Sequence, residues 1–173
     1  MSERWKPSVT VAAIASRSRA GRTEYLLVEE ETTDGLRLNN PAGHLDPGES
    51  PQEAVVREAL EETARAFAPE RLVGVYLARL PLAGAPGGDV TYLRFAFAGM
   101  VGEPDPRRSL DTGIVRTLWM TLDELRASRP RHRSPLLLRS VEDAAAGRSF
   151  PLDAIVTDPS VHRPGGGGAD GAS

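Results

Sequence analysis

Three glutamates, Glu58, Glu61 and Glu62, are the residues whose type and spacing best suit chemistry. Positions three and four apart are neighbours on a helix, so these like charges are held close at a cost of roughly 0.2–0.5 kcal/mol per pair in an isolated helix. A bound cation would remove that repulsion. Because Mg²⁺ takes oxygen ligands and keeps some of its waters, the spacing predicts a magnesium site. The alternative is a solvated helix face.

The loop "NPAGHLDPGES" directly precedes this helix. Its glycines, Gly43 and Gly48, let the backbone turn tightly and approach a ligand or a metal closely. The loop also brings Glu49 to the start of the helix, where we expect it to pair with Arg57 if the loop folds back. That pair would be structural and would fix the direction of the loop carbonyls. We expect Arg57 to project to the side of the carboxylate cluster.

The helix itself begins with a capping box formed by Ser50 and Glu53. At about 100° per residue, one side carries a largely apolar set that should face the core, with the glutamates roughly opposite. That set comprises Val56, Leu60, Thr63 and Phe67. The sequence therefore predicts one core face and one carboxylate face.

Strand candidates outnumber helices in the rest of the chain. Two of them are separated by the polar loop "SRSRAGR", which predicts a hairpin. The strand candidates read "PSVTVAAIA", "TEYLLVEE", "RLVGVYLARL", "VTYLRFAFAG" and "IVRTLWM". Two further helices are expected to start at the caps Thr121 and Ser134, the second ending near Gly147. We expect residues 1–158 to form a single domain and the glycine-rich residues 159–173 to form a flexible tail.

Composition narrows the function classes. The chain has 173 residues, a net charge of −3 and no cysteine. The acidic balance argues against nucleic-acid coating, and the missing cysteine excludes thiol nucleophiles, disulfides and thiolate zinc sites. No apolar run approaches the length of a membrane span. We expect a cytoplasmic protein, monomeric or homodimeric, that acts on a small molecule.

The spacing Gly43, Glu49, then Arg57-Glu58-Ala59-Leu60-Glu61-Glu62 resembles the signature of the Nudix hydrolases. That resemblance implies an α/β fold, an α/β/α sandwich around a central mixed β-sheet. It also implies Mg²⁺ as cofactor, with Mn²⁺ as a substitute. By match to the signature, Glu58 and Glu62 are expected to bind the metal directly, with Gly43 beside them. Glu61 would be a further ligand or the base that orients the water, so Glu58 and Glu61 are the candidate catalytic residues.

The match departs from the family at the end of the signature, where Ala64 and Arg65 replace a glycine and an apolar residue. The family's glycine ends the helix in a left-handed conformation, which costs a non-glycine residue on the order of 1 kcal/mol. The substitution concerns the helix end and stability more than the chemistry, and it allows the helix to continue to Phe67.

Segments beyond the signature resemble the NudJ-type phosphatases within this family, among them "NNPAGHL", "YLRFAFA" and "GRSFPLDAI". That resemblance implies release of orthophosphate from nucleoside tri- and diphosphates and from hydroxymethylpyrimidine pyrophosphate, a thiamine precursor. One alternative is a pyrophosphohydrolase acting on nucleoside triphosphates or on ADP-ribose. An alternative of another class is a non-catalytic Nudix module that senses a nucleotide.

Four residues outside the carboxylate cluster complete the candidate site. Strand alternation puts Arg94 on one face with Tyr92, where a guanidinium could hold phosphate; the alternative is a surface partner across the strands. Asn40 and His44, on either side of the glycine turn, are candidate substrate contacts. Asp111 is a candidate extra metal ligand from across the cleft.

Overall fold

The computed structural model describes residues 4–81 and 88–163. Seven strands form one mixed sheet in the order β3-β2-β1-β6-β5, with β4 paired to β1 and β7 to β2. The strands are β1 (Ser8–Arg19), β2 (Arg22–Thr32), β3 (Gly35–Asn39), β4 (Ala42–His44), β5 (Phe67–Pro81), β6 (Asp89–Val101) and β7 (Ile114–Thr121). The pairing of β1 with β6 is parallel and the others are antiparallel.

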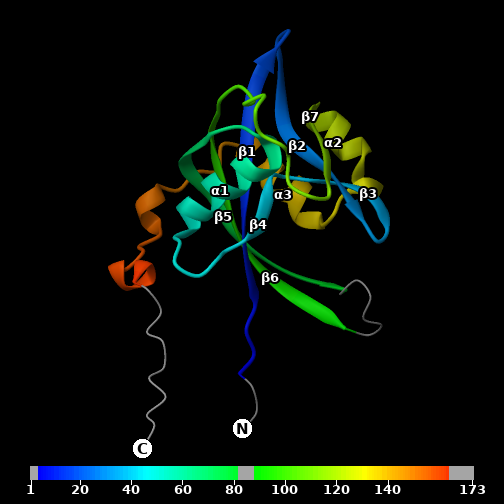
Figure 1. Ribbon diagram of the computed structural model, residues 1–173. Helices are drawn as coiled ribbons and strands as arrows, with labels where there is room; N and C mark the ends of the chain where they lie inside the picture. The colour runs from blue at the N-terminus through cyan, green and yellow to red at the C-terminus, as the bar shows by residue number, and fades with distance from the viewer. Residues whose placement is uncertain (1–3, 82–87, 164–173) are drawn as a thin grey trace, which may run out of the picture.

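The long strand β1 organises the sheet. One edge pairs with β6 along residues 8–15, while the other edge pairs first with β4 and then, from Ser16, with β2. The sheet therefore splits along this second edge, and β4 with its glycine loop lies in the opening. Figure 1 shows β2 and β3 diverging from β5 and β6 beyond this point.

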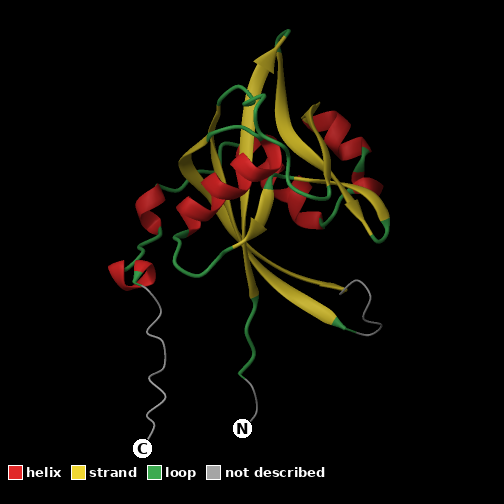
Figure 2. Ribbon diagram, in the orientation of Figure 1, coloured by secondary structure: helices red, strands yellow, loops and turns green. Residues whose placement is uncertain are grey.

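Helices cover both faces of the sheet (Figure 2). Alternate residues of β1 point to opposite faces. The first set, Val11 and Ala13, packs in one core with α1 (Pro51–Thr63), while Ala12 and Ile14 pack in another with α2 (Leu122–Ala127) and α3 (Pro135–Ala145). The predicted α/β/α sandwich around a mixed sheet is confirmed.

The helix α1 differs from expectation in its phase and its end. Ser50 and Glu53 form the expected capping box. However, the residues buried on α1 are Ala54, Val55, Glu58, Ala59, Glu62 and Thr63. The expected core residues Val56 and Leu60 are only half-buried. The small side chains of Ala54 and Ala59 let this face pack closely on β1, and that contact turns two of the glutamates inward.

The same helix ends at Thr63, so the suggestion that it continues to Phe67 is wrong. Ala64 adopts the left-handed conformation (φ 55°, ψ 22°), and its N–H donates to the carbonyl of Leu60. Phe67 instead begins β5 and is buried in the core on the α1 side. Alanine thus occupies the position where glycine would be unstrained.

The β1–β2 hairpin is tighter than the sequence suggested. Pairing continues to Arg19 and Arg22, so the turn consists of Ala20 and Gly21 alone, both at positive φ. Most of "SRSRAGR" is therefore strand. Two positive φ values are typical of the turns whose twist matches that of antiparallel strands.

The segment after α3 folds back toward α1. It contains two short 3₁₀ turns, η2 (Leu152–Ala154) and η3 (Pro159–His162), and another, η1 (Arg129–Arg131), lies just before α3. His162 Nδ1 lies 3.0 Å from the carbonyl oxygen of Gly48, and Gln52 donates to the carbonyl of Leu152. Ordered structure thus passes the predicted boundary at 158, and residues 164–173 of the predicted tail lie outside the described residues. In the described part of the chain, no helix combines the length and apolar character that a membrane crossing requires.

Candidate active site

Arg57 links the glycine loop to the helix. Its guanidinium donates to both carboxylate oxygens of Glu49, at 3.0 and 2.7 Å, and to the backbone carbonyl of His44 at 2.9 Å. It also donates to Glu58 at 2.8 Å and to Glu61 at 3.0 Å. The expected contact of Glu49 with Arg57 is present. The expectation that Arg57 projects to the side of the cluster is wrong, because its planar fork of donors lets one side chain bind three carboxylates.

These contacts fix the charges of the pair. The hydrogen bond from Arg57 holds the pKa of Glu49 below its ordinary value. In return, the hydrogen bond to Glu49 raises the pKa of Arg57 above its ordinary value, so this cation stays charged at all relevant pH. The pair closes the loop over the first turns of α1.

Glu62 and Glu58 are buried carboxylates. One oxygen of Glu62 accepts the backbone N–H of Ala42 at 2.9 Å. Burial raises the pKa of Glu62 to about 8, and the negative charge of Glu58 adds to that rise. Burial also raises the pKa of Glu58, although Arg57 opposes the shift. Ionising both carboxylates together is costly, and a cation bound between them would lower that cost.

Gly43 makes room for Glu58. A Cβ at this position would lie 2.2 Å from the carboxylate carbon and from one carboxylate oxygen of Glu58. No side chain fits there unless Glu58 moves. The requirement for glycine is thus steric and comes from contact between β4 and the helix.

The donor set suits a hard divalent cation such as Mg²⁺ in its chemistry. However, within residues 4–81 and 88–163 no three Asp, Glu or His side chains converge closely enough to hold an ion by themselves. Each of the three glutamates already accepts a hydrogen bond within the protein. Arg57 donates to Glu58 and Glu61, and the backbone N–H of Ala42 donates to Glu62. The Gly43 carbonyl, water and substrate phosphate would have to complete the shell, and Mg²⁺ commonly keeps several waters.

A cavity of about 460 Å³ opens on the α3 side of the sheet; Glu58, Glu61 and Glu62 do not line it, and β4 connects it to them. Ala42, Gly43 and His44 of β4 form the rim nearest to Glu58 and Glu62. The floor comes from Thr10, Tyr92 and Arg94, and apolar walls come from Leu80, Pro81 and Leu136. Glu30, Asp34 and Asn39 also line the cavity, with Arg133 close to Glu30. Its size and mixed lining are typical of small-molecule sites.

Arg94 is the buried cation of this cavity. It is 7 % exposed, so it is not the surface residue that the alternative expected, although it does contact Thr10, its partner across the strands. Its Nε lies 3.5 Å from Thr10 Oγ1, and its Nη1 has no hydrogen-bond partner among the described residues. Burial lowers the pKa of Arg94 to about 10, and the charges of Glu30 and Glu62 oppose that shift. A buried guanidinium with a free donor suits an anionic ligand.

The two candidate substrate contacts beside the glycine turn differ in position. His44 lines the cavity, with its ring 6.4 Å from that of Tyr92. Asn40 does not line it. Its side chain is buried and accepts a 3.4 Å hydrogen bond from Ser140 of α3, so it contacts a helix where a substrate contact was expected. Its neighbour Asn39 lines the cavity instead.

Asp111 lies at the far end of α1 and is exposed. Its backbone N–H donates to the carbonyl of Glu61 at 3.0 Å. The Asp111 charge contributes to the raised pKa of Glu62, after burial and the charges of Glu58 and Glu30. It is close enough to influence the carboxylates without touching them.

Sequence reasoning did not identify Glu30 and Asn39. Both lie on the β2–β3 hairpin, where strand alternation alone does not show which side faces a ligand. Register supplies the missing information: β7 carries an extra residue, Val115, where it pairs with Glu29 and Glu30. Glu29 binds Arg116 and Arg131, whereas Glu30 faces the cavity. Bulges commonly redirect side chains beside active sites.

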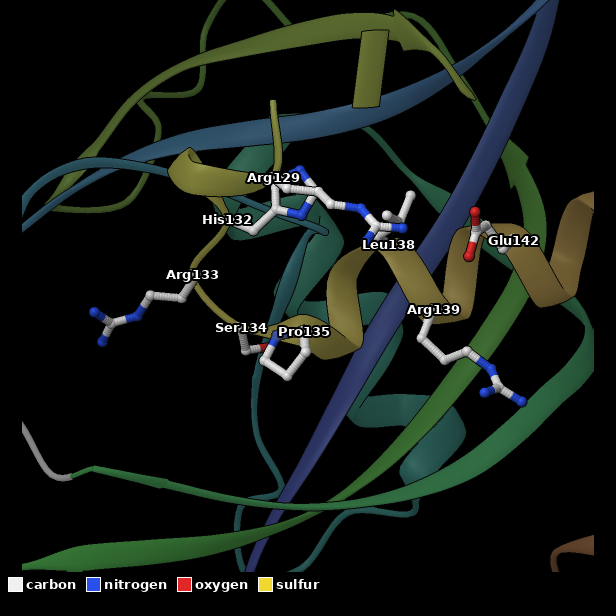
Figure 3. Close-up of a pocket in the computed structure, with 8 residues that line it drawn as sticks. All are labelled: Arg129, His132, Arg133, Ser134, Pro135, Leu138, Arg139 and Glu142. Carbon is white, nitrogen blue, oxygen red and sulfur yellow. The ribbon is translucent and has the colours of Figure 1, made fainter. Parts of the chain in front are cut away.

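A second cavity lies between η1 and α3 (Figure 3). Arg129, Arg133 and Arg139 give it a basic lining, and His132 and the acidic Glu142 also line it. Figure 3 shows Arg133 and Arg139 pointing away from each other. Arg139 pairs with Asp143 and Glu142 with Arg126. These arginines do not converge on one point, and this cavity has no lining residue from β4, whose Ala42 and Gly43 lie against Glu62 and Glu58. The cavity beside Gly43 is the better candidate active site.

Comparison with known proteins agrees with this choice. The NUDIX domain family matches residues 6–139. The chain is 34% identical over 152 residues to the phosphatase NudJ of Escherichia coli (strain K12) and to that of Shigella boydii serotype 4 (strain Sb227), covering 87% of this chain and 92% of each relative.

Solved structures show the same fold. A NUDIX hydrolase from Nitrosomonas europaea is 47% identical with a TM-score of 0.78, covering 88% of this chain and 98% of that one. The NUDIX domain of Shewanella oneidensis NrtR, solved with ADP ribose, has a TM-score of 0.62 over 83% of this chain and 90% of that one. At 15% identity, the second likeness extends to the fold alone.

Proposed function

Because this chain belongs to the Nudix hydrolase family, we propose that it is a Mg²⁺-dependent phosphatase that releases orthophosphate from phosphoanhydrides. The substrates proposed are nucleoside tri- and diphosphates and hydroxymethylpyrimidine pyrophosphate. The likeness to NudJ phosphatases over 87% of the chain supports this product. The observation that carries the proposal is the pair of buried carboxylates, Glu58 and Glu62, next to β4 and a cavity whose floor holds buried Arg94, with no partner for its Nη1 among the described residues.

The metal would be held by Glu58 and Glu62 beside Gly43, with Glu61 either as a further ligand or as the base that orients the water. Nudix hydrolases generally use divalent metal ions. When bound, such an ion neutralises phosphate oxygens and favours attack by water. Mn²⁺ would be an acceptable substitute, because the ligands are all oxygens.

Residues of the protein would position the substrate and the attacking water. Arg94 would hold a phosphate oxygen with its free Nη1, so the anhydride lies between the cavity floor and the rim of β4. Glu61, half-exposed and bound on one side by Arg57, would orient the attacking water. Glu49 and Arg57 would support the site by holding the loop that carries Gly43.

The test compares Glu58→Gln and Glu62→Gln with a matched control, Glu53→Gln, which removes an exposed carboxylate from the same helix. Phosphate release from GDP is measured against Mg²⁺ concentration. We expect the two buried variants to lose at least about 100-fold in kcat and to need more Mg²⁺, as removal of groups that stabilise transition-state charge does. The control should remain within about threefold, since the Glu53 role is helix capping.

The alternative of a nucleotide-sensing module predicts a different result. If both buried variants bind GDP as the wild type does and no sample releases phosphate, the carboxylates serve ligand recognition without turnover. Retention of all three signature glutamates in this sequence favours turnover.

A further inference from the structure

Several polar atoms of the residues that line the cavity beside Gly43 have no hydrogen-bond partner among the described residues. Six buried side-chain atoms in the described part of the chain make no hydrogen bond, and three of them belong to residues that line this cavity. These three are Glu30 Oε1, Asn39 Oδ1 and Arg94 Nη1. They come from three different strands, β2, β3 and β6. Because buried polar groups are almost always paired, such a concentration suits the binding of a polar ligand.

The three groups lie within electrostatic reach of one another. Burial raises the pKa of Glu30, and the charge of Arg133, a hydrogen bond from the side chain of Asn39 and the charge of Arg94 oppose that rise. Arg133 Nε is 3.6 Å from Glu30 Oε1, which is beyond hydrogen-bond length, and the Arg133 side chain is 44% exposed. An N–H group of a ligand could therefore replace Arg133 beside Glu30 and make a shorter contact.

Arg94 can be reached by the same ligand as Glu30. It lines the cavity together with Glu30 and Asn39, and the charges of both Glu30 and Glu62 act on its pKa. A ligand whose phosphates contact Arg94 and the rim of β4 would place its other end against Glu30 and Asn39. Leu80, Pro81 and Leu136 supply apolar surface along the way, which suits the faces of a flat ring.

Glu30 Oε1 and Asn39 Oδ1, which make no hydrogen bond among the described residues, are both acceptors. They fit a ring edge that presents two adjacent N–H donors, which guanine does with its ring N1–H and its 2-amino group. A 4-aminopyrimidine would instead set a ring nitrogen lone pair against one of these oxygens. We propose that Glu30 and Asn39 select a guanine-type ring by accepting hydrogen bonds from this donor edge. The inference rests on the proposed function, because the ring must be joined to the phosphates that the site cleaves.

The test compares GDP with IDP, which differ only in the 2-amino group. Calorimetric titration of the whole protein in EDTA measures affinity without hydrolysis. We expect GDP to bind about 10- to 100-fold more tightly than IDP, the effect of one hydrogen bond to a charged acceptor. In Glu30→Gln the GDP:IDP ratio should fall to about threefold or less, because a neutral amide oxygen is a weaker acceptor. The control Glu31→Gln, with the same charge change on an exposed side chain of β2, should keep the wild-type ratio.

Three results would overturn the inference. Equal binding of GDP and IDP by the wild type would show that the 2-amino group is not recognised. Absence of GDP binding would exclude GDP as a ligand of this cavity. If Glu30→Gln keeps the wild-type preference for GDP over IDP, Glu30 does not recognise the 2-amino group. Failure of the proposed function looks different: GDP would be preferred over IDP in EDTA, yet no phosphate would be released from GDP when Mg²⁺ is supplied.

Discussion

Replacement of Gly43 by alanine is the most direct perturbation of the carboxylate site. The added Cβ would lie 2.2 Å from the Glu58 carboxylate, whereas ordinary van der Waals contacts begin at 3.4 Å. The carboxylate would have to move by about 1 Å, which also breaks the 2.8 Å hydrogen bond from Arg57. A displacement of that size in a positioned group costs about 100-fold in rate. Gly43 is not at positive φ, so the change adds no backbone strain.

The assay is phosphate release from GDP with Mg²⁺, paired with thermal unfolding. We expect kcat to fall about 100-fold while unfolding changes by about 1–3 kcal/mol, the usual effect of overpacking. The control Gly102→Ala places a Cβ in open space, 4.0 Å from its nearest neighbour, and should keep full activity. Shortening the acid in the double variant Gly43→Ala/Glu58→Asp should recover part of the lost rate. Full activity in Gly43→Ala, or no recovery in the folded double variant, would refute the steric reasoning.

Three further predictions concern stability and binding. Ala64→Gly should raise the free energy of unfolding by up to about 1 kcal/mol, because it relieves the left-handed alanine, and should leave kcat unchanged; altered kcat without a change in melting would contradict this. Arg94→Lys should lower kcat/KM for GDP at least about tenfold, since the single ammonium lacks the fork of donors; unchanged steady-state kinetics would remove Arg94 from phosphate binding. Glu29→Gln should cost about 1–3 kcal/mol near pH 7. The hydrogen bond from Arg116 holds the pKa of Glu29 below 4.5, so this stabilisation is complete above pH 4.5 and is lost as pH falls through the lower folded-state value. Chemical unfolding of the variant should therefore show a flatter acid limb than the wild type, and parallel pH profiles would contradict the assignment.

Local sequence rules predicted the elements well. The capping boxes of α1 and α2 and the Ser134 cap of α3 are all present. These signals are short-range, since each depends on a few residues and their own backbone. The spacing of Gly43, Glu49 and Arg57 could be read for the same reason, because one loop and one helix bring them together.

Tertiary contacts decided what the sequence could not. The phase of α1 follows its packing on β1 through Ala54 and Ala59, so apolarity alone misplaced Val56 and Leu60. The choice between Asn39 and Asn40 depends on a one-residue step, which reverses the direction of a side chain near a strand end. Glu30 reaches the cavity through pairing of strands far apart in sequence, which no local pattern reports.

The measurement that most directly tests the central claim is a ³¹P NMR time course with Mg²⁺ on separate samples of GTP, GDP and hydroxymethylpyrimidine pyrophosphate. If the protein is an orthophosphate-releasing Nudix phosphatase, inorganic phosphate appears stepwise from GTP, with GDP and then GMP as organic products. Appearance of pyrophosphate from GTP would place the attack at the inner phosphorus and contradict the proposed product. No turnover of any of the three would contradict the phosphatase assignment itself.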